Sequence, residues 1–286
     1  MTPLHSEIFE ALGTRWTIQT LTGLPSSVRQ HIAERIEEFD KCLSRFRPDS
    51  TVSHMAVVAG RYAFPDWLQP LFAFYKQLYD ATGGRVTPLI GAALARAGYD
   101  ANYSFRSQPQ SALPRWEGLI QLKGATLILV EPALLDFGAA GKGFLVDEIG
   151  RLMEAAGIDQ YVIDASGDIR HRGNRPERIG LEHPTDSAKV IGVVELQNGS
   201  LCASATNRRQ WGNGLHHVFD PVSLAPTDRY IATWVTASDT MTADGLATAL
   251  FFVEPQALSS FGQFDYLRID ADSALDYSTA FRGQLV

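Results

Sequence analysis

The residues best suited to chemistry lie in the segment Leu134–Asp147, which contains an acid, Asp136, a lysine, Lys142, and three glycines. Glycines before a helix let ligand atoms approach backbone N–H groups, and a helix N-terminus favours negative charge. Lys142 adds a positive charge there. The segment predicts a site for a phosphate-bearing ligand, with Asp136 available for a hydroxyl, a ring N–H or a metal. It is not a Walker motif, because Gly143 follows the lysine. Taken alone, it fits a structural turn between a strand and a helix even better.

Asp244 and Thr248 form the second candidate pair, in the segment Asp239–Thr248. Residues four apart share one face of a helix. A carboxylate and a hydroxyl are hard oxygen ligands that suit Mg²⁺, which takes few protein ligands and keeps several waters. An aspartate near a helix start is also common as a cap. On spacing alone, capping is the more frequent role.

A third candidate is the segment from His216 to Pro221, which includes His217, Phe219 and Asp220. Adjacent residues of a strand point to opposite faces, so at most one of the two histidines faces a given pocket. Such a histidine can act as a base, orient a phosphate or simply bond a backbone carbonyl.

The loop Leu43–Ser50 also carries ligand-binding residue types: Phe46 lies between Arg45 and Arg47. It fits either a surface loop with one buried aromatic or a binding loop. In the second case the ring stacks on a ligand and the cations bind phosphate.

The elements that must position these residues alternate irregularly between helices and hairpin-like strand pairs. This pattern favours a single α+β domain over residues 1–286, with largely antiparallel sheets, over a doubly wound fold. No GxGxxG motif is present, which disfavours a Rossmann site. Apolar periodicity predicts helices at Val28–Cys42, Asp66–Ala81, Gly91–Ala97 and Met241–Phe252. It also predicts a helix that follows the glycines of the segment Leu134–Asp147 and ends at Ala156. It predicts strands at Leu12–Thr20, Gly118–Leu122, Thr126–Val130, Arg178–Glu182, Val190–Leu196, Ser200–Ser204, Trp234–Ala237 and Tyr266–Asp270. The segment Tyr161–Arg170 is predicted as a buried strand that runs into a Ser-Gly-Asp turn.

Composition narrows the function classes. The chain has 45% hydrophobic and 20% charged residues, as expected for a globular protein, and its net charge of −7 argues against broad binding to nucleic acid or anionic membranes. No segment approaches 18 uninterrupted apolar residues, so no membrane span is expected. The two cysteines lack CxxC spacing and are expected to be free. Without a signal peptide or lipobox we expect a cytoplasmic protein, or a periplasmic one if an export signal was removed.

Together these segments resemble the FAD:protein FMN transferases, the ApbE-type flavin transferases. The resemblance runs from Leu12 to about Val253, with the motifs in family order. They are Leu12-Gly-Thr14, Ser44-Arg-Phe-Arg-Pro-Asp-Ser50, Gly84-Arg-Val-Thr-Pro88, Asp136-Phe-Gly-Ala-Ala-Gly-Lys-Gly143, Asp164-Ala-Ser-Gly-Asp168, His216 to Pro221, and Met241-Thr-Ala-Asp-Gly-Leu-Ala-Thr248. The fourth and the last are the most specific.

The resemblance implies an ApbE-like, T-fold-related domain and a defined reaction. FAD is the substrate and Mg²⁺ the cofactor. A Ser or Thr hydroxyl of an acceptor flavoprotein attacks the FMN-side phosphorus, FMN becomes esterified to the acceptor, and AMP leaves. The implied metal ligands are the Ala139 carbonyl, Asp244 and Thr248. The implied flavin-nucleotide contacts are Leu12, Phe46, Arg47, Val86, Thr87, Asp136, Lys142 and Phe219. As a separate hypothesis, His217 or Asp220 deprotonates the acceptor hydroxyl.

Several positions depart from the family pattern, mainly in loops. They are Leu12 for Met, Thr87 for Asp, Asp164 for Asn, Ser166 for Gly, Ala205-Thr206-Asn207 for Gly-Asp-Tyr, and Leu224 for Gly. The change at 205–207 removes an aromatic ring expected near the flavin. These departures leave two alternatives to flavin transfer open: a pyrophosphatase that splits FAD into FMN and AMP, and an FAD-binding paralogue without turnover.

Overall fold

An eight-stranded sheet forms the largest layer of the molecule. The computed structural model describes residues 5–208, 210–212, 214–281 and 285. Within the sheet the strand order is β1-β2-β6-β7-β10-β15-β16-β17, and every neighbouring pair is antiparallel. The strands are β1 (His5–Ala11), β2 (Thr14–Thr20), β6 (Tyr161–Asp164), β7 (Asp168–Arg172), β10 (Gly199–Ala205), β15 (Tyr230–Ala237), β16 (Asp265–Asp270) and β17 (Leu275–Tyr277).

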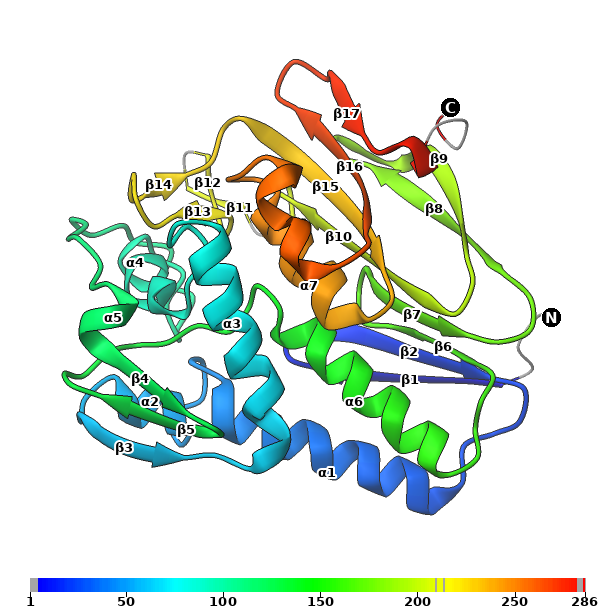
Figure 1. Cartoon of the computed structure of the whole chain (residues 1–286), viewed down its shortest axis with the longest axis horizontal. Helices are drawn as coiled ribbons and strands as arrows, with labels where there is room; N and C mark the ends of the chain where they lie inside the picture. The colour runs from blue at the N-terminus through cyan, green and yellow to red at the C-terminus, as the bar shows by residue number, and fades with distance from the viewer. Residues whose placement is uncertain (1–4, 209, 213, 282–284, 286) are drawn as a thin grey trace.

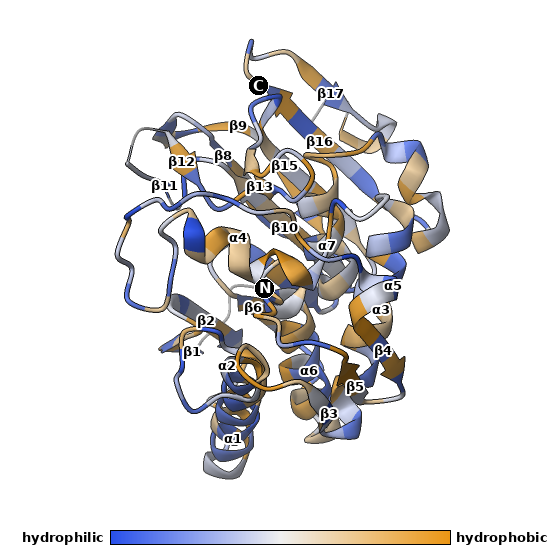
Figure 2. Ribbon diagram, turned by 90° about the vertical axis from the view of Figure 1, so that its left-hand side faces the viewer, coloured by the Kyte–Doolittle hydropathy of each residue, from blue (hydrophilic) through white to orange (hydrophobic). Residues whose placement is uncertain are grey.

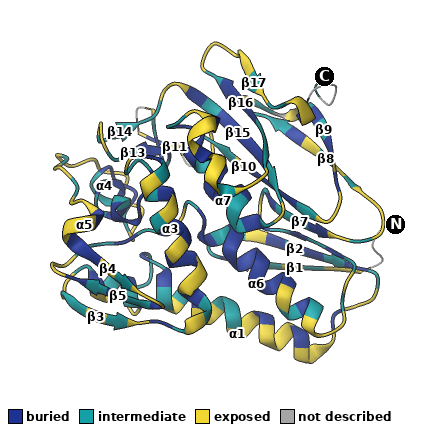
Figure 3. Cartoon of the chain, in the orientation of Figure 1, coloured by how far each residue is buried: buried dark blue, intermediate teal, exposed yellow. Residues whose placement is uncertain are grey.

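Two central helices, α6 (Gly141–Ala155) and α7 (Thr240–Ala249), lie against one face of this sheet (Figure 1). The spacing of Phe144, Leu145, Ile149 and Met153 puts all four side chains in the core, as the sequence predicts. Beyond them lie α1 (Ser26–Leu43) and α3 (Gln69–Ala81). In Figure 3 the central helices are largely dark blue, whereas α1 is exposed along its outer side. That side is hydrophilic in Figure 2.

The remaining elements surround this two-layer core. A three-stranded sheet of order β3-β5-β4 lies beside α3, and β8 pairs with β9 in a separate hairpin. The small strands are β3 (Gly60–Ala63), β4 (Ile120–Lys123), β5 (Thr126–Leu129), β8 (Glu177–His183), β9 (Asp186–Leu196), β11 (Gln210–Trp211), β12 (Leu215–His216), β13 (Phe219–Asp220) and β14 (Ala225–Pro226). The short helices are α2 (Thr51–Met55), α4 (Gly91–Arg96), α5 (Trp116–Leu119), η1 (Asp66–Leu68), η2 (Pro88–Ile90), η3 (Pro255–Phe261) and η4 (Thr279–Phe281).

This arrangement confirms the α+β prediction of helices packed on largely antiparallel sheets. Cys42 and Cys202 are free, as expected. Within the described ranges, none of the helices has the length and apolar character needed to cross a membrane.

The prediction of one strand from Leu12 to Thr20 is wrong at its start. Leu12 and Gly13 instead form the two-residue turn between β1 and β2, and both have positive φ, 50° and 69°. A tight hairpin of this length favours such a backbone, because its twist matches that of the strands. Leucine is unusual in that conformation, so Leu12 did not mark the position as a turn.

Candidate active site

One cavity of about 850 Å³ gathers the predicted site residues from segments far apart in the chain. This volume is typical of sites for small molecules and cofactors. Every residue predicted for the site lines it except Asp220: the lining includes Leu12, Phe46, Arg47, Val86, Thr87, Asp136, Ala139, Lys142, His217, Phe219, Asp244 and Thr248.

Lys142, in the first turn of α6, brings a positive charge to the cavity. Its ammonium lies 2.6 Å from Oδ2 of the buried Asp168 and donates to the carbonyl of Ala165 at 2.9 Å. Burial alone would lower the pKa of Lys142, but the carboxylates of Asp168 and Asp244 outweigh it and raise the pKa above its ordinary value. Lys142 is therefore protonated and offers a fixed positive charge to an anionic ligand.

Asp244 and Thr248 on α7 face the start of α6. Oδ2 of Asp244 accepts a hydrogen bond from Gly143 N at 2.9 Å, and Oγ1 of Thr248 donates to the carbonyl of Ala139 at 3.4 Å. Asp244 does not cap the helix: Asp239 does, by accepting from Thr242 N at 2.8 Å. Asp244 therefore does not cap its own helix: it accepts instead from a first-turn N–H of α6, and it lines the cavity.

The charge balance around Asp244 favours a bound cation. Burial, together with the neighbouring Asp168 carboxylate, raises the pKa of Asp244 well above its usual range. Among the described residues, Lys142 is the cation whose charge opposes this rise in the pKa of Asp244, and a second cation bound beside Asp244 would favour its carboxylate form. The described residues contain no group of three or more His, Cys, Asp or Glu side chains placed to hold a metal. The oxygens of Asp244, Thr248 and Ala139 instead fit a cation that takes few protein ligands, as Mg²⁺ does.

Asp136 is held by Arg45, one of the two arginines in the loop Leu43–Ser50. Nε of Arg45 pairs with Oδ2 of Asp136, whose Oδ1 accepts from Gly138 N at 2.7 Å. The guanidinium also donates to the carbonyl of Tyr99 at 2.6 Å and lies 4.2 Å above the centre of the Phe46 ring. Arg45 is buried, and it orients Asp136 in the cavity wall.

Arg47, the arginine that the resemblance implies as a flavin contact, does not pair with Asp136. It lines the cavity, but its guanidinium is bound by the carboxylates of Glu37, Asp40 and Asp49. The loop contains both arginines two residues apart, and nothing in its sequence distinguishes the buried one from the exposed one. Its contact with a flavin nucleotide stays a prediction.

Replacing Arg45 by Met should destabilise the protein and weaken FAD binding together. Breaking a buried ion pair leaves Asp136 with an uncompensated charge, which costs about 3 kcal/mol. Arg47→Met is the matched control for stability, because its partly exposed ion pairs contribute less than about 1 kcal/mol. Urea unfolding without FAD measures the loss of stability, and the added protection by FAD measures its binding. Equal losses of stability in the two variants would contradict the assignment to Arg45.

A wall of aromatic rings lines the cavity near Arg45. The rings of Phe46 and Tyr103 are nearly parallel, 8° apart with centroids at 5.3 Å, and Tyr99 stacks on Trp211 at 5.3 Å. Tyr103 and Phe105 are about half exposed, at 47% and 48%. Both residues lie in the segment 101–115, which forms neither helix nor strand. The fold brings their rings to a cavity that lacks the family aromatic at 205–207, and this wall offers stacking surface to a planar ring.

The two histidines lie in different surroundings, although only His216 belongs to a strand, β12. His216 is buried and its Nε2 lies 3.0 Å from the carbonyl of Thr227, so it has a structural role. His217 lines the cavity. Asp220 instead pairs with Arg85, another cavity-lining residue that the sequence did not indicate, and accepts from Val222 N at 2.8 Å.

Two departures from the family pattern keep a glycine-like backbone. Ser166 has φ 59° and Leu224 has φ 55°, in the left-handed region that favours glycine. Both turns therefore hold a residue with a side chain in a backbone conformation that favours glycine. Ser166 places its side chain at the cavity.

Comparison with known proteins agrees with this geometry. Residues 12–267 match the model of the ApbE family. The chain is 33% identical over 266 residues to an FAD:protein FMN transferase of Vibrio cholerae, covering 84% of this chain and 78% of that protein. It is 26% identical over 270 residues to the Haemophilus influenzae protein of the same name, covering 85% and 76%.

Two solved structures share the fold. The ApbE protein of Thermotoga maritima superposes with a TM-score of 0.85 at 19% identity, over 99% of each chain. Flavin transferase ApbE from Vibrio cholerae superposes with a TM-score of 0.81 at 22% identity, over 98% of this chain and 99% of that one. The match to the family model covers most of the sequence, and these structures share its architecture. The chain belongs to the ApbE family.

Proposed function

We propose that this protein is an enzyme that transfers FMN from FAD to a Ser or Thr hydroxyl of an acceptor flavoprotein, in a reaction that requires Mg²⁺. The product is a phosphoester-linked flavin, and AMP is released. The observation that carries the proposal is the single cavity in which Lys142 and the oxygens of Asp244, Thr248 and Ala139 lie beside an aromatic wall. Relatives named FAD:protein FMN transferase support the same reaction.

The side chains of the cavity match the parts of FAD. The aromatic wall suits one of its planar rings, and Asp136, held by Arg45, can accept a hydrogen bond from a ring N–H or a ribose hydroxyl. Lys142 supplies a positive charge for the pyrophosphate. Phosphoryl transfer depends mainly on positioning and charge neutralisation, so these roles are sufficient without a covalent intermediate on the enzyme.

Asp244, Thr248 and the carbonyl of Ala139 are the residues that would hold Mg²⁺. When bound, Mg²⁺ supplies neutralisation of the charge that develops on the phosphate oxygens. Asp244 contributes a buried carboxylate, and its hydrogen bond from Gly143 N fixes the orientation of that group. Lys142, on the facing helix α6, would neutralise part of the same phosphate charge.

His217 is the better candidate for the base that deprotonates the acceptor hydroxyl, because it lines the cavity whereas Asp220 does not. His217→Gln should lower kcat for transfer by about a hundredfold, the usual contribution of a general base. Asp220→Asn should mainly affect KM, because it frees Arg85 from its ion pair. Initial rates of acceptor labelling at varied FAD concentration measure both. A larger fall in kcat for Asp220→Asn than for His217→Gln would reverse the assignment.

One assay separates transfer from the two alternatives. The protein is incubated with FAD and Mg²⁺, with and without an acceptor flavoprotein, and AMP and protein-bound flavin are measured. We expect AMP only with the acceptor, in equal amount to labelled acceptor. AMP without acceptor would identify a pyrophosphatase, and bound FAD without AMP would identify a binding protein. If FAD does not bind at all, the proposal fails.

A further inference from the structure

Three polar contacts join α7 to α6 and to the turn before it, and they follow one spacing. Thr248 contacts Ala139, Asp244 contacts Gly143, and Asp147 contacts Thr240. In this order, the residue number on α7 falls by four from each contact to the next, and the residue number on the α6 side rises by four. Four residues are about one helical turn, so the contacts lie on facing sides of antiparallel segments, roughly one turn apart. The first two hold the proposed metal ligands, and the third does not.

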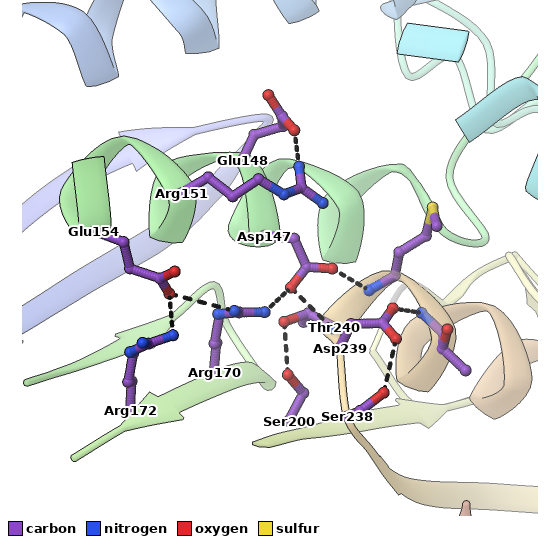
Figure 4. Close-up of polar contacts among 12 residues, drawn as sticks. Asp147, Glu148, Arg151, Glu154, Arg170, Arg172, Ser200, Ser238, Asp239 and Thr240 are labelled. Atoms are coloured by element: carbon purple, nitrogen blue, oxygen red, sulfur yellow. Dashed lines mark hydrogen bonds and ion pairs between the residues drawn. The ribbon is translucent and has the colours of Figure 1, made fainter. Parts of the chain in front are cut away.

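The third contact uses both oxygens of one buried carboxylate (Figure 4). Oδ1 of Asp147 accepts from Thr240 N at 3.0 Å, and Oδ2 accepts from Met241 N at 2.9 Å. These are N–H groups of the first turn of α7, which lack partners within the helix. Asp239, from the same chain segment as α7, accepts from Thr242 N. Asp147 therefore does what a cap does, but from a different helix, and so ties the start of α7 to α6.

Arg170 holds Asp147 in place from the sheet. Its Nη1 lies 2.6 Å from Oδ1 of Asp147, and its Nε donates to the hydroxyl of Tyr161 at 3.1 Å. Arg170 belongs to β7, the strand that begins with Asp168, the partner of Lys142. The carboxylate of Asp147 thus links three elements that carry cavity residues.

The backbones are in close contact at the middle of this interface. A Cβ atom added at Gly143 would lie 2.3 Å from the carbonyl oxygen of Thr240 and 2.7 Å from Cβ of Asp244. The helices have no room to tilt toward each other there. The position of α7 along the axis of α6 is then set by the hydrogen bonds on either side of Gly143, which are those of Asp147 and of Thr248.

We propose that Asp147, held by Arg170, is a positioning residue that sets the register of α7 against α6 and so fixes the spacing of the Ala139, Asp244 and Thr248 oxygens. This inference rests on the proposed metal site. Loss of the Asp147 carboxylate frees the start of α7 from α6, and the oxygens further along α7 lose their alignment with Ala139.

Asp147→Ala and Asp239→Ala form a matched pair of variants. Each removes one carboxylate that accepts hydrogen bonds from the first turn of α7. Only Asp147 lies on α6 and so links the two helices. Mn²⁺ binding to the full chain, with and without FAD, is measured by electron paramagnetic resonance of the free ion. We expect Asp147→Ala to weaken Mn²⁺ binding about tenfold, as for other residues that orient metal ligands. Asp239→Ala should stay within about twofold of wild type, because it leaves the link intact.

Gly143→Ala tests the same interface by pushing the helices apart, and should weaken Mn²⁺ binding in the same direction. Asp147→Asn, which keeps the volume and one acceptor, should lie between wild type and Asp147→Ala, and it replaces the alanine variant if that chain does not fold. Equal effects of Asp147→Ala and Asp239→Ala, or no effect of either, overturn the inference. A wild-type chain that binds Mn²⁺ but transfers no FMN overturns the proposed function alone.

Discussion

Replacing Asp244 by Ala is expected to abolish Mg²⁺-dependent flavin transfer and leave a folded protein. Neutralisation by a metal contributes several kcal/mol to such a reaction, and each 1.36 kcal/mol is a factor of ten in rate, so the loss is on the order of a thousandfold or more. Stability should change little, because two effects oppose each other. Gly143 N loses its acceptor, but the repulsion between Asp244 and Asp168 disappears.

The measurement is acceptor labelling at increasing Mg²⁺, with thermal unfolding as a check on the fold. Asp239→Ala is the control, since Asp239 begins the same helix but does not line the cavity. It should keep transfer near the wild-type rate. If Asp244→Ala retains full activity in EDTA-treated buffer, the metal assignment is wrong.

Lys142→Met should cause the second large loss, in both activity and stability. The substitution leaves the buried carboxylate of Asp168 without its cation at 2.6 Å, which costs about 3 kcal/mol of stability. Removing a charge that is aimed at the reacting phosphate should lower kcat by a further factor of about a thousand.

A double variant separates the two effects of Lys142. Lys142→Met with Asp168→Asn removes the uncompensated charge, so urea unfolding should show most of the lost stability restored, while transfer stays low. If the double variant regains activity together with stability, Lys142 acts only as a structural partner of Asp168. AMP release and acceptor labelling, measured side by side, show whether the remaining turnover is transfer or hydrolysis.

Local patterns were sufficient to predict most of the elements. The apolar spacing of α6 identified a helix and its buried face, because a helix of this length must bury one stripe. Arg178–Glu182 and Val190–Leu196 were correctly predicted as strands, and they pair with each other as β8 and β9. The hairpin turn at Leu12 was missed, because a leucine with positive φ carries no turn signature.

The site residues also divide into those that local sequence patterns indicated and those that they did not. The segment of Asp136 and Lys142 was recognisable because glycines, an acid and a lysine are rare in one short run, although alone it fitted a turn. Arg45 was noted only as one of two cations in its loop, and Arg85 and the rings of Tyr103, Phe105 and Trp211 were not recognised as site residues. Only the packing of distant segments brings these side chains to the cavity.

By itself the sequence determined the residue types: a lysine after glycines, an Asp and a Thr one helical turn apart, and a His before an Asp-Pro turn. Those choices fix the available chemistry, because charge and ligand type are properties of single side chains. Only the tertiary structure decided which of these groups meet. It buried Arg45 and left Arg47 among surface acids, placed Asp220 on Arg85, and joined α6 to α7 through Asp147. Such pairings depend on the docking of helices and loops far apart in the chain, and that docking has no local signature.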